Sequence, residues 1–162
     1  MRKVVVNTTP ILILGHIGKL DILRKLYGEI YITDAVFREI TVTNDAASAA
    51  LLSAKEWIHV MSIEKPQDYA MFRAKLHAGE VETMILAMQK DFCADLVILD
   101  DLAARKTAKY LGLTVTGTMG VLLRAKQEGL IQEIKPLLDE IIANGFYISD
   151  KMIRMILDNA GE

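Results

Sequence analysis

Five short runs of apolar residues recur along this chain, and they constrain its fold more than any other feature. They are VVV (4–6), IYI (30–32), WIHV (57–60), LVIL (96–99) and LTV (113–115). Most of them are continuously apolar rather than alternating, which is typical of strands buried on both faces. Such strands occur in parallel sheets that are covered by helices on each side. The runs therefore predict a central, mostly parallel sheet inside a three-layer sandwich.

Helical patterns occupy the segments between these runs. A threonine at position 8 or 9 can cap the first helix, which has Pro10 in its first turn. Apolar residues spaced i, i+3, i+4 and i+7 from Val81 to Met88 predict a helix that follows Gly79. Gly112 is placed to end the helix that follows the aspartates at 100 and 101. Further helices are expected over about 35–40, 118–127, 133–143 and 149–159.

Strands that alternate with helices predict right-handed βαβ units and hence an α/β/α fold. After Val115 the pattern turns helical. We therefore expect a single domain over residues 1–162, with a core over about 1–128 and C-terminal helices over about 129–162. The apolar faces of these last helices are expected to pack mostly in the core. A homodimer contact or a groove for a partner helix is the alternative.

Composition limits the class of protein. The chain has 162 residues, and 52% of them are apolar, which is enough to bury a core. A formal net charge of −2 argues against binding nucleic acid by bulk charge alone. The single cysteine, Cys93, allows no intrachain disulfide, and neither a secretory signal nor an apolar run of ~20 residues is visible. A cytoplasmic protein with no membrane contact is therefore expected.

Acidic and amide side chains fall where the predicted strands end. In open α/β sheets, ligands bind beyond the carboxyl ends of the strands. The polar residues expected near that edge are Asn7, Glu39, Glu80, Glu82, Asp100 and Asp101. Carboxylates gathered in this way repel one another unless a cation neutralises them, and Mg²⁺ and Mn²⁺ prefer oxygen ligands. The sequence has no Cys/His cluster, which argues against zinc.

Each of these acids also has a purely structural interpretation. Glu80 and Glu82 lie in a first helical turn, where the helix dipole favours negative charge. They are about 200° apart around the helix, so both are not expected to face one ion. Asp100 or Asp101 can cap the next helix, and Glu39 can be a solvated helix residue. Their joint placement at one edge is what favours a site.

Four segments, taken in order, are similar to those of PIN domains, the small metal-dependent nuclease fold of many prokaryotic toxin–antitoxin ribonucleases. They are VVVNTTP (4–10), VFREI (36–40), GEVETMILA (79–87) and VILDDLAARKTAKYLGLTVTGTMGVLLRAK (97–126). Over nearly its whole length, the chain resembles an uncharacterised subgroup of predicted nucleic-acid-binding PIN proteins. This resemblance implies a metal-dependent nuclease with an antitoxin protein as a partner.

The resemblance also implies which residues form the site. Catalytic positions fall on Asn7, Glu39, Glu82 and Asp101, and metal ligation falls on Glu39, Glu82, Asp100 and Asp101. Glu82 is assigned because the segment from Glu82 to Ile85 keeps the spacing of a D-x-x-I-A-A element found in family members; Glu80 and Asp100 are neighbours that can substitute. Most active members carry Asp where this chain has Asn7. An amide oxygen can still ligate Mg²⁺, but it adds no charge and binds the ion more weakly.

The leading hypothesis is a Mg²⁺- or Mn²⁺-dependent endoribonuclease that cleaves single-stranded RNA and acts as the toxin of a toxin–antitoxin pair. Thr8, Arg105 and Lys106 are the expected nucleic-acid contacts, although a solvated helix face explains the two cations equally well. The alternative is a catalytically weak or inactive module that binds nucleic acid or a protein partner. A receiver-type phosphorylation domain is disfavoured, because its paired aspartates follow the first strand and here the pair follows the fourth.

Overall fold

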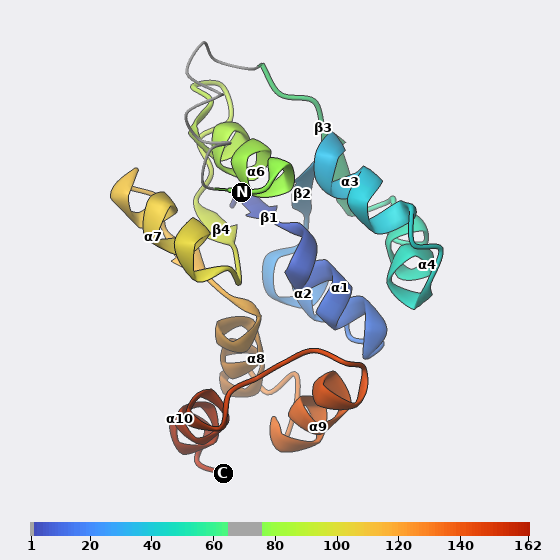
Figure 1. Cartoon of the computed structure of the whole chain (residues 1–162), viewed down its shortest axis with the longest axis vertical. Coiled ribbons are helices and arrows are strands. Elements are labelled where there is room, and N and C mark those ends of the chain that lie inside the picture. The colour runs from blue at the N-terminus through green and yellow to red at the C-terminus, as the bar shows by residue number, and fades with distance from the viewer. Residues whose placement is uncertain (1, 65–75) are drawn as a thin grey trace.

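A five-stranded parallel sheet forms the centre of the protein (Figure 1). The computed structural model describes residues 2–64 and 76–162. The strands are β1 (Val4–Val6), β2 (Ile30–Thr33), β3 (Ile58–Met61), β4 (Leu96–Ile98) and β5 (Val115–Thr116), and their spatial order is β3-β2-β1-β4-β5. Every pairing between neighbouring strands is parallel. The predicted α/β class with a central parallel sheet is confirmed.

Helices connect the strands and cover both faces of the sheet. The helices before β4 are α1 (Thr8–His16), α2 (Asp21–Tyr27), α3 (Asp34–Thr41), α4 (Ala46–Leu52) and α6 (Ala78–Met88). Those after it are α7 (Leu102–Tyr110), α8 (Thr118–Gln127), α9 (Lys135–Ala143) and α10 (Asp150–Ala160). Thr33, Asp45 and Ser149 cap α3, α4 and α10, because each side chain accepts a bond from the backbone N–H three residues later.

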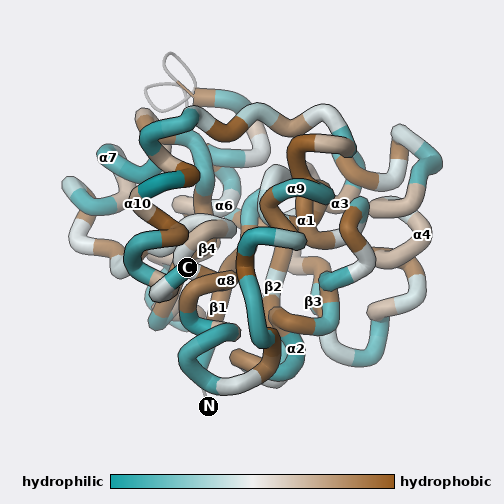
Figure 2. The backbone as a smooth tube through the Cα atoms, turned by 90° about the horizontal axis from the view of Figure 1, so that it is seen from below, coloured by the Kyte–Doolittle hydropathy of each residue, from teal (hydrophilic) through white to brown (hydrophobic). Residues whose placement is uncertain are grey.

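The side chains of β1 explain why the strands are apolar on both faces. Val4, Val5 and Val6 have no exposed surface. Val4 and Val6 belong to one core with α1 to α4 and the C-terminal helices, whereas Val5 belongs to a second core with α6 and α7. In Figure 2 the central strands are coloured hydrophobic, and α10 alternates between hydrophilic and hydrophobic residues. These two cores produce the predicted three-layer arrangement.

The C-terminal helices pack on the first of these two faces. Leu138 on α9 and Ile156 on α10 lie in the same apolar core as Val4. In Figure 1, α8, α9 and α10 lie together at one end of the molecule. The expected extension therefore continues the core of that face, and its boundary near residue 128 stays a prediction.

The structure differs from the expected elements at β5 and at two short helices. The LTV run predicts a strand from Leu113, but β5 is Val115–Thr116. The N–H of Leu113 instead donates to the carbonyl of Ala108 (3.0 Å), which completes the end of α7 together with Gly112 at φ +81°. The sequence pattern does not predict α2 or α4, because each has only 7 residues and too few turns for a clear period.

Two further expectations concern the whole chain. Within the described ranges, no helix has both the length and the hydropathy needed to cross a bilayer. Cys93 is a free, exposed thiol, in agreement with a chain that has a single cysteine.

Candidate functional site

Asn7 lies where β1 ends and α1 begins. Its backbone N–H donates to the carbonyl of Ile98 at the end of β4 (3.0 Å), so it stands at the carboxyl edge of two central strands. Asn7 is the N-cap residue of α1, yet its side chain makes no capping bond. Its amide oxygen instead accepts a bond from the hydroxyl of Thr83 on α6 (3.4 Å). The side chain is therefore buried and turned toward α6.

Glu39 reaches the same edge from the C-terminal half of α3. One of its carboxylate oxygens accepts a bond from the hydroxyl of Thr8 at the start of α1 (2.8 Å). The other oxygen lies over Gly79 in the first turn of α6, where an added Cβ would stand 2.5 Å from it. The absence of a side chain at Gly79 thus makes room for the exposed carboxylate of Glu39.

Glu80 is a second carboxylate at this edge, also in the first turn of α6. It accepts a bond from the backbone N–H of His77 (3.0 Å), as in one half of a capping box. Burial raises the pKa of Glu80, and the negative charges of Asp101 and Glu39 raise it further against the effect of the His77 bond. Glu80 is therefore close enough to Asp101 and to Glu39 for its charge to interact with each of theirs.

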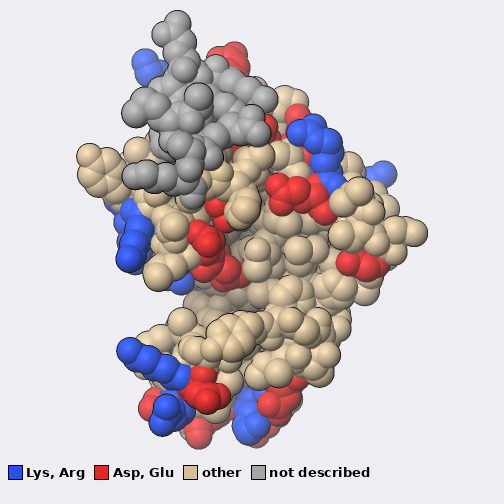
Figure 3. Space-filling model, in the orientation of Figure 1, with Lys and Arg blue, Asp and Glu red and all other residues tan. Residues whose placement is uncertain are grey.

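Asp101 is the third carboxylate and is exposed to solvent. It is the N-cap of α7, and its Oδ1 accepts a bond from the backbone N–H of Ala104 (2.8 Å). We call Glu39, Glu80 and Asp101 the acidic edge. Figure 3 shows acidic side chains gathered above a hollow that separates this part of the surface from the C-terminal helices.

Asp100 is bonded to the start of α8, and the metal-ligand role that the sequence predicts for it stays a prediction. Both of its carboxylate oxygens accept bonds from Thr118 at the start of α8, one from the backbone N–H (2.7 Å) and one from the hydroxyl (2.5 Å). Burial raises the pKa of Asp100, and the bonds from Thr118 and the charge of Arg105 oppose that rise. In the structure, Asp100 ties the end of β4 to α8.

Glu82 is buried and bonded to the first turn of α3. It is 5% exposed, and its Oε2 accepts a bond from the backbone N–H of Ala35 in the first turn of α3 (3.2 Å). Glu80 and Glu82 therefore diverge, as their spacing along α6 predicts. Charge contacts with the other two acids are established for Glu80, and the catalytic role that the resemblance implies for Glu82 stays a prediction.

The predicted nucleic-acid contacts lie in three different surroundings. The hydroxyl of Thr8 is occupied by Glu39. Arg105 is half-buried, and its charge lies close to Asp100. Lys106 is exposed and lines a groove of 360 Å³ between α7, α8 and α10. We call this the basic groove, since its α7 wall is formed by Leu102, Arg105, Lys106 and Lys109.

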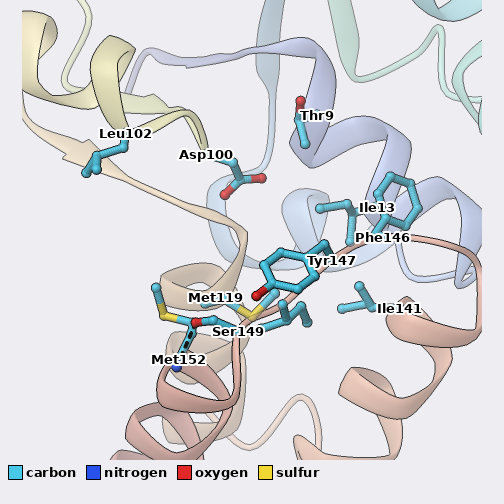
Figure 4. A pocket seen from close by; sticks show the side chains of 11 residues that line it. Thr9, Ile13, Asp100, Leu102, Met119, Ile141, Phe146, Tyr147, Ser149 and Met152 are labelled. Atoms are coloured by element: carbon cyan, nitrogen blue, oxygen red, sulfur yellow. Dashed lines mark hydrogen bonds between the residues drawn. The ribbon is translucent and has the colours of Figure 1, made fainter.

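An apolar pocket of 660 Å³ opens next to the acidic edge (Figure 4). Its lining combines α1, the start of α7, α8, α9, the segment 146–149 and α10. In Figure 4 the Asp100 carboxylate lies at one end and the Tyr147 ring in the middle. We call it the apolar pocket, with the lining Thr9, Ile13, Asp100, Leu102, Met119, Ile141, Phe146, Tyr147, Ile148, Ser149 and Met152.

The sequence did not identify three residues that shape these sites, namely Thr118, Gly79 and Tyr147. Thr118 follows β5 in a GTMG segment, and a threonine at the start of a helix is a capping signal. Its partner, however, is Asp100 from another strand, which no local pattern reveals. Gly79 carried only a helix-start signal, and Tyr147 lies in a short apolar piece between two helices.

The acidic edge has the donor chemistry of a site for a hard divalent cation. Its carboxylates come from three separate elements, and the pKa of Glu80 is raised partly by its neighbours. A cation relieves repulsion of this kind. Among the residues that the structure describes, no three His, Cys, Asp or Glu side chains are already closed into a metal-binding group. Mg²⁺ keeps several waters and needs only one or two carboxylates, so the residues present fit such an ion.

The match to a known family agrees with this fold. Residues 3–162 match the family described as "DUF3368: PIN domain". Among solved structures, the chain is similar to a domain of a functionally unknown protein from Methanocaldococcus jannaschii DSM 2661. That match has 23% sequence identity and a TM-score of 0.44, and it covers 72% of this chain and 91% of that chain. No curated protein matches.

Proposed function

The chain belongs to the PIN-domain family, and from this we propose that it is a metal-dependent nuclease that cleaves single-stranded RNA. PIN domains are typically nucleases, which supports the general class of activity. The observation that carries the proposal is the acidic edge, where α3, α6 and the start of α7 each contribute a carboxylate. RNA as substrate, Mg²⁺ or Mn²⁺ as the ion and a single site at this edge are parts of the proposal.

Glu39, Glu80 and Asp101 would hold the ion. A bound divalent cation supplies two things in phosphodiester hydrolysis, a lowered pKa for a water molecule and compensation of charge on the scissile phosphate. Three carboxylates without a cation repel a phosphate, so cleavage is expected to require the ion. The chain itself orients the carboxylates, through the hydroxyl of Thr8 at Glu39 and the N–H of His77 at Glu80.

The test uses Asp101→Asn, because an asparagine keeps the N-cap of α7 while removing the charge. We expect this variant to fold like the parent and to lose at least about tenfold in metal-dependent cleavage of single-stranded RNA, the equivalent of ~1.4 kcal/mol. Asp45→Asn is the matched control, since Asp45 caps α4 by accepting a bond from the N–H of Ser48 (3.0 Å). Equal rates for the parent and Asp101→Asn would assign the cleavage to a contaminant.

Asn7 favours a second candidate, a module that binds nucleic acid or a protein partner without cutting. Asn7 stands at the carboxyl end of β1 with no charge, and its oxygen is already bonded to Thr83. Asn7→Asp adds a carboxylate there, so we expect Mn²⁺ to bind about tenfold more tightly in calorimetry. A parent that binds no Mn²⁺ at millimolar concentration and gains both binding and cleavage in Asn7→Asp would identify it as a module that lacks one charge.

Partners form the last part of the proposal. The PIN resemblance suggests an antitoxin protein, and exposed apolar residues such as Met155 on α10 offer it a contact surface. The same surface supports a homodimer. Light scattering at high concentration separates these, because a mass equal to one chain rules out the homodimer and leaves the antitoxin. A reducing, cytoplasmic setting remains the expectation from the single free cysteine.

A further inference from the structure

The apolar pocket has the size and lining of a site for a small planar group. Its volume of 660 Å³ lies within the range of about 300–1,000 Å³ that is usual for ligand sites. Most of its lining is aliphatic, aromatic or thioether, and the polar groups are Thr9, Asp100, Ser149 and the hydroxyl of Tyr147. No Lys or Arg occurs among the described residues that line it. An uncharged ring with hydrogen-bonding edges therefore suits this pocket better than a phosphate does.

Two pairs of consecutive residues join the pocket to the acidic edge. Thr8 bonds to Glu39, while Thr9 lines the pocket. Asp101 belongs to the acidic edge, while Asp100 lines the pocket. Because neighbouring residues serve both sites, a ligand with its phosphate at the acidic edge has an adjoining group at the mouth of the pocket.

Tyr147 is the residue of the pocket that most needs an explanation. It is 90% exposed, although it lies within an apolar lining that includes Phe146, and Figure 4 shows its ring at the centre of the pocket. An exposed aromatic ring offers a flat face at low entropic cost, on which a base can stack. Asp100 adds an acceptor, since each of its oxygens keeps a lone pair beyond the bonds from Thr118.

The basic groove continues from the pocket. The two cavities share Leu102, Met119 and Met152 in their linings. The groove adds Arg105, Lys106 and Lys109, which are the kind of side chains that contact phosphate. A nucleotide chain carries bases and phosphates in alternation, so one ligand can use the apolar pocket and the basic groove together.

We propose that the apolar pocket holds a base of single-stranded RNA, stacked on Tyr147, next to the phosphate that is bound at the acidic edge. This inference rests on the proposed nuclease function, because the acidic edge defines where the phosphate lies. An amphipathic helix of a protein partner is the competing occupant, but the position of the pocket beside the acidic edge favours a ligand that also carries a phosphate.

Binding can be tested without any cleavage. Methyl-labelled methionines are followed by NMR while the full chain is titrated with adenosine 5′-monophosphate in the presence of Mg²⁺. We expect the signals of Met119 and Met152 to shift, since both line the pocket, and the signal of the fully buried Met84 to stay unchanged. Ribose 5-phosphate, which lacks the base, is the control ligand. Equal shifts with both ligands, or no shift with the nucleotide, would contradict the proposal that the apolar pocket binds a base.

The second experiment separates this pocket from the nuclease proposal. Tyr147→Ala is compared with Tyr110→Ala, since both tyrosines are 90% exposed and only Tyr147 lines the pocket. We expect Tyr147→Ala to raise KM for single-stranded RNA about tenfold, and Tyr110→Ala to stay within twofold of the parent. If the parent cleaves RNA and both alanine variants have the same KM, the proposed base site is contradicted and the nuclease proposal is supported. Nucleotide binding that depends on Tyr147, without any cleavage of RNA, would support the base site and contradict the nuclease proposal.

Discussion

At the scale of single residues, Glu80 and Glu82 show how two acids in one helical turn acquire different tasks. Glu80 is held beside Glu39 and Asp101, and its pKa is raised by burial and by their charges. Glu82 is buried against α3 and accepts the N–H of Ala35. One carboxylate therefore belongs to the proposed ion site, and the other joins two helices.

This difference predicts opposite effects for two isosteric substitutions. Glu80→Gln removes a charge that burial and like charges make unfavourable, so we expect unchanged or higher stability together with Mn²⁺ binding weakened about tenfold. Glu82→Gln weakens a buried, charge-assisted bond to Ala35, so we expect about 1–2 kcal/mol lower stability and unchanged Mn²⁺ affinity. Chemical denaturation and calorimetry measure the two quantities. Loss of Mn²⁺ binding only in Glu82→Gln would instead indicate that Glu82, the residue that the family pattern selects, is the metal ligand.

The positions near the site could be predicted from the sequence, but the direction of each side chain could not. Polar residues at the ends of apolar runs were enough to place Asn7 and Asp101 at one edge. The bonds from Thr118 turn Asp100 toward α8, and this depends on two strands that meet only in the folded sheet. Periodicity states that Glu80 and Glu82 diverge, but not which of them faces the acids.

At the scale of the element, the first turn of α6 contains a glycine that lowers helix stability and leaves room for a neighbouring carboxylate. Gly79 is a poor helix former, yet it lies under the carboxylate of Glu39. Gly79→Ala is therefore expected to raise the free energy of unfolding by up to about 1 kcal/mol. Its Cβ would stand 2.5 Å from an oxygen of Glu39, and this flexible side chain must move away. We expect cleavage and Mn²⁺ affinity to fall at the same time.

Gly15→Ala provides the contrast. A Cβ at Gly15 on α1 would meet the backbone Cα of Ala47 on α4 at 2.8 Å, and a backbone cannot yield as a side chain does. That variant is expected to lose stability in thermal unfolding, whereas Gly79→Ala gains it. A gain in stability at Gly79 without any loss of Mn²⁺ affinity would show that the position of Glu39 is irrelevant to ion binding.

Elements were predictable where one pattern dominated over enough residues. Strands such as β1 and β4 are buried on both faces, and continuous apolar runs are the direct consequence. α2 and α4 are too short for a clear helical period. Asp45 is nevertheless a capping residue, and it could have indicated the start of α4. The start of β5 was misplaced because the N–H of Leu113 is used to end α7.

At the scale of the whole molecule, the C-terminal helices complete the surface beside the site. Without α8, α9 and the segment 146–149, the apolar pocket would lack most of its lining. The docking of these helices therefore shapes the apolar pocket as well as the core. One side chain links them, because Glu162 contacts residues of α8 and of the start of α9.

Glu162 caps α9 from a distance. Its carboxylate accepts bonds from the backbone N–H groups of Ile134 (2.7 Å) and Lys135 (3.0 Å), and it pairs with Lys126 on α8 (2.9 Å). The two backbone bonds, and then Lys126, lower the pKa of Glu162 to about 2. A carboxylate whose pKa is lower in the folded chain than in the unfolded one stabilises the fold while it is ionised.

The pH dependence of stability tests this link. The contribution of Glu162 is expected to be complete above its ordinary pKa of 4.5, and to be lost as the pH falls from there through about 2. Glu162→Gln should therefore be less stable than the parent near neutral pH, with a difference that shrinks over that acidic range in urea denaturation. Glu140→Gln, at an exposed residue of α9, is the matched control and should show no such difference. If the parent and Glu162→Gln differ by the same amount at every pH, ionisation of Glu162 does not hold the C-terminal helices in place, and their docking rests on the apolar core alone.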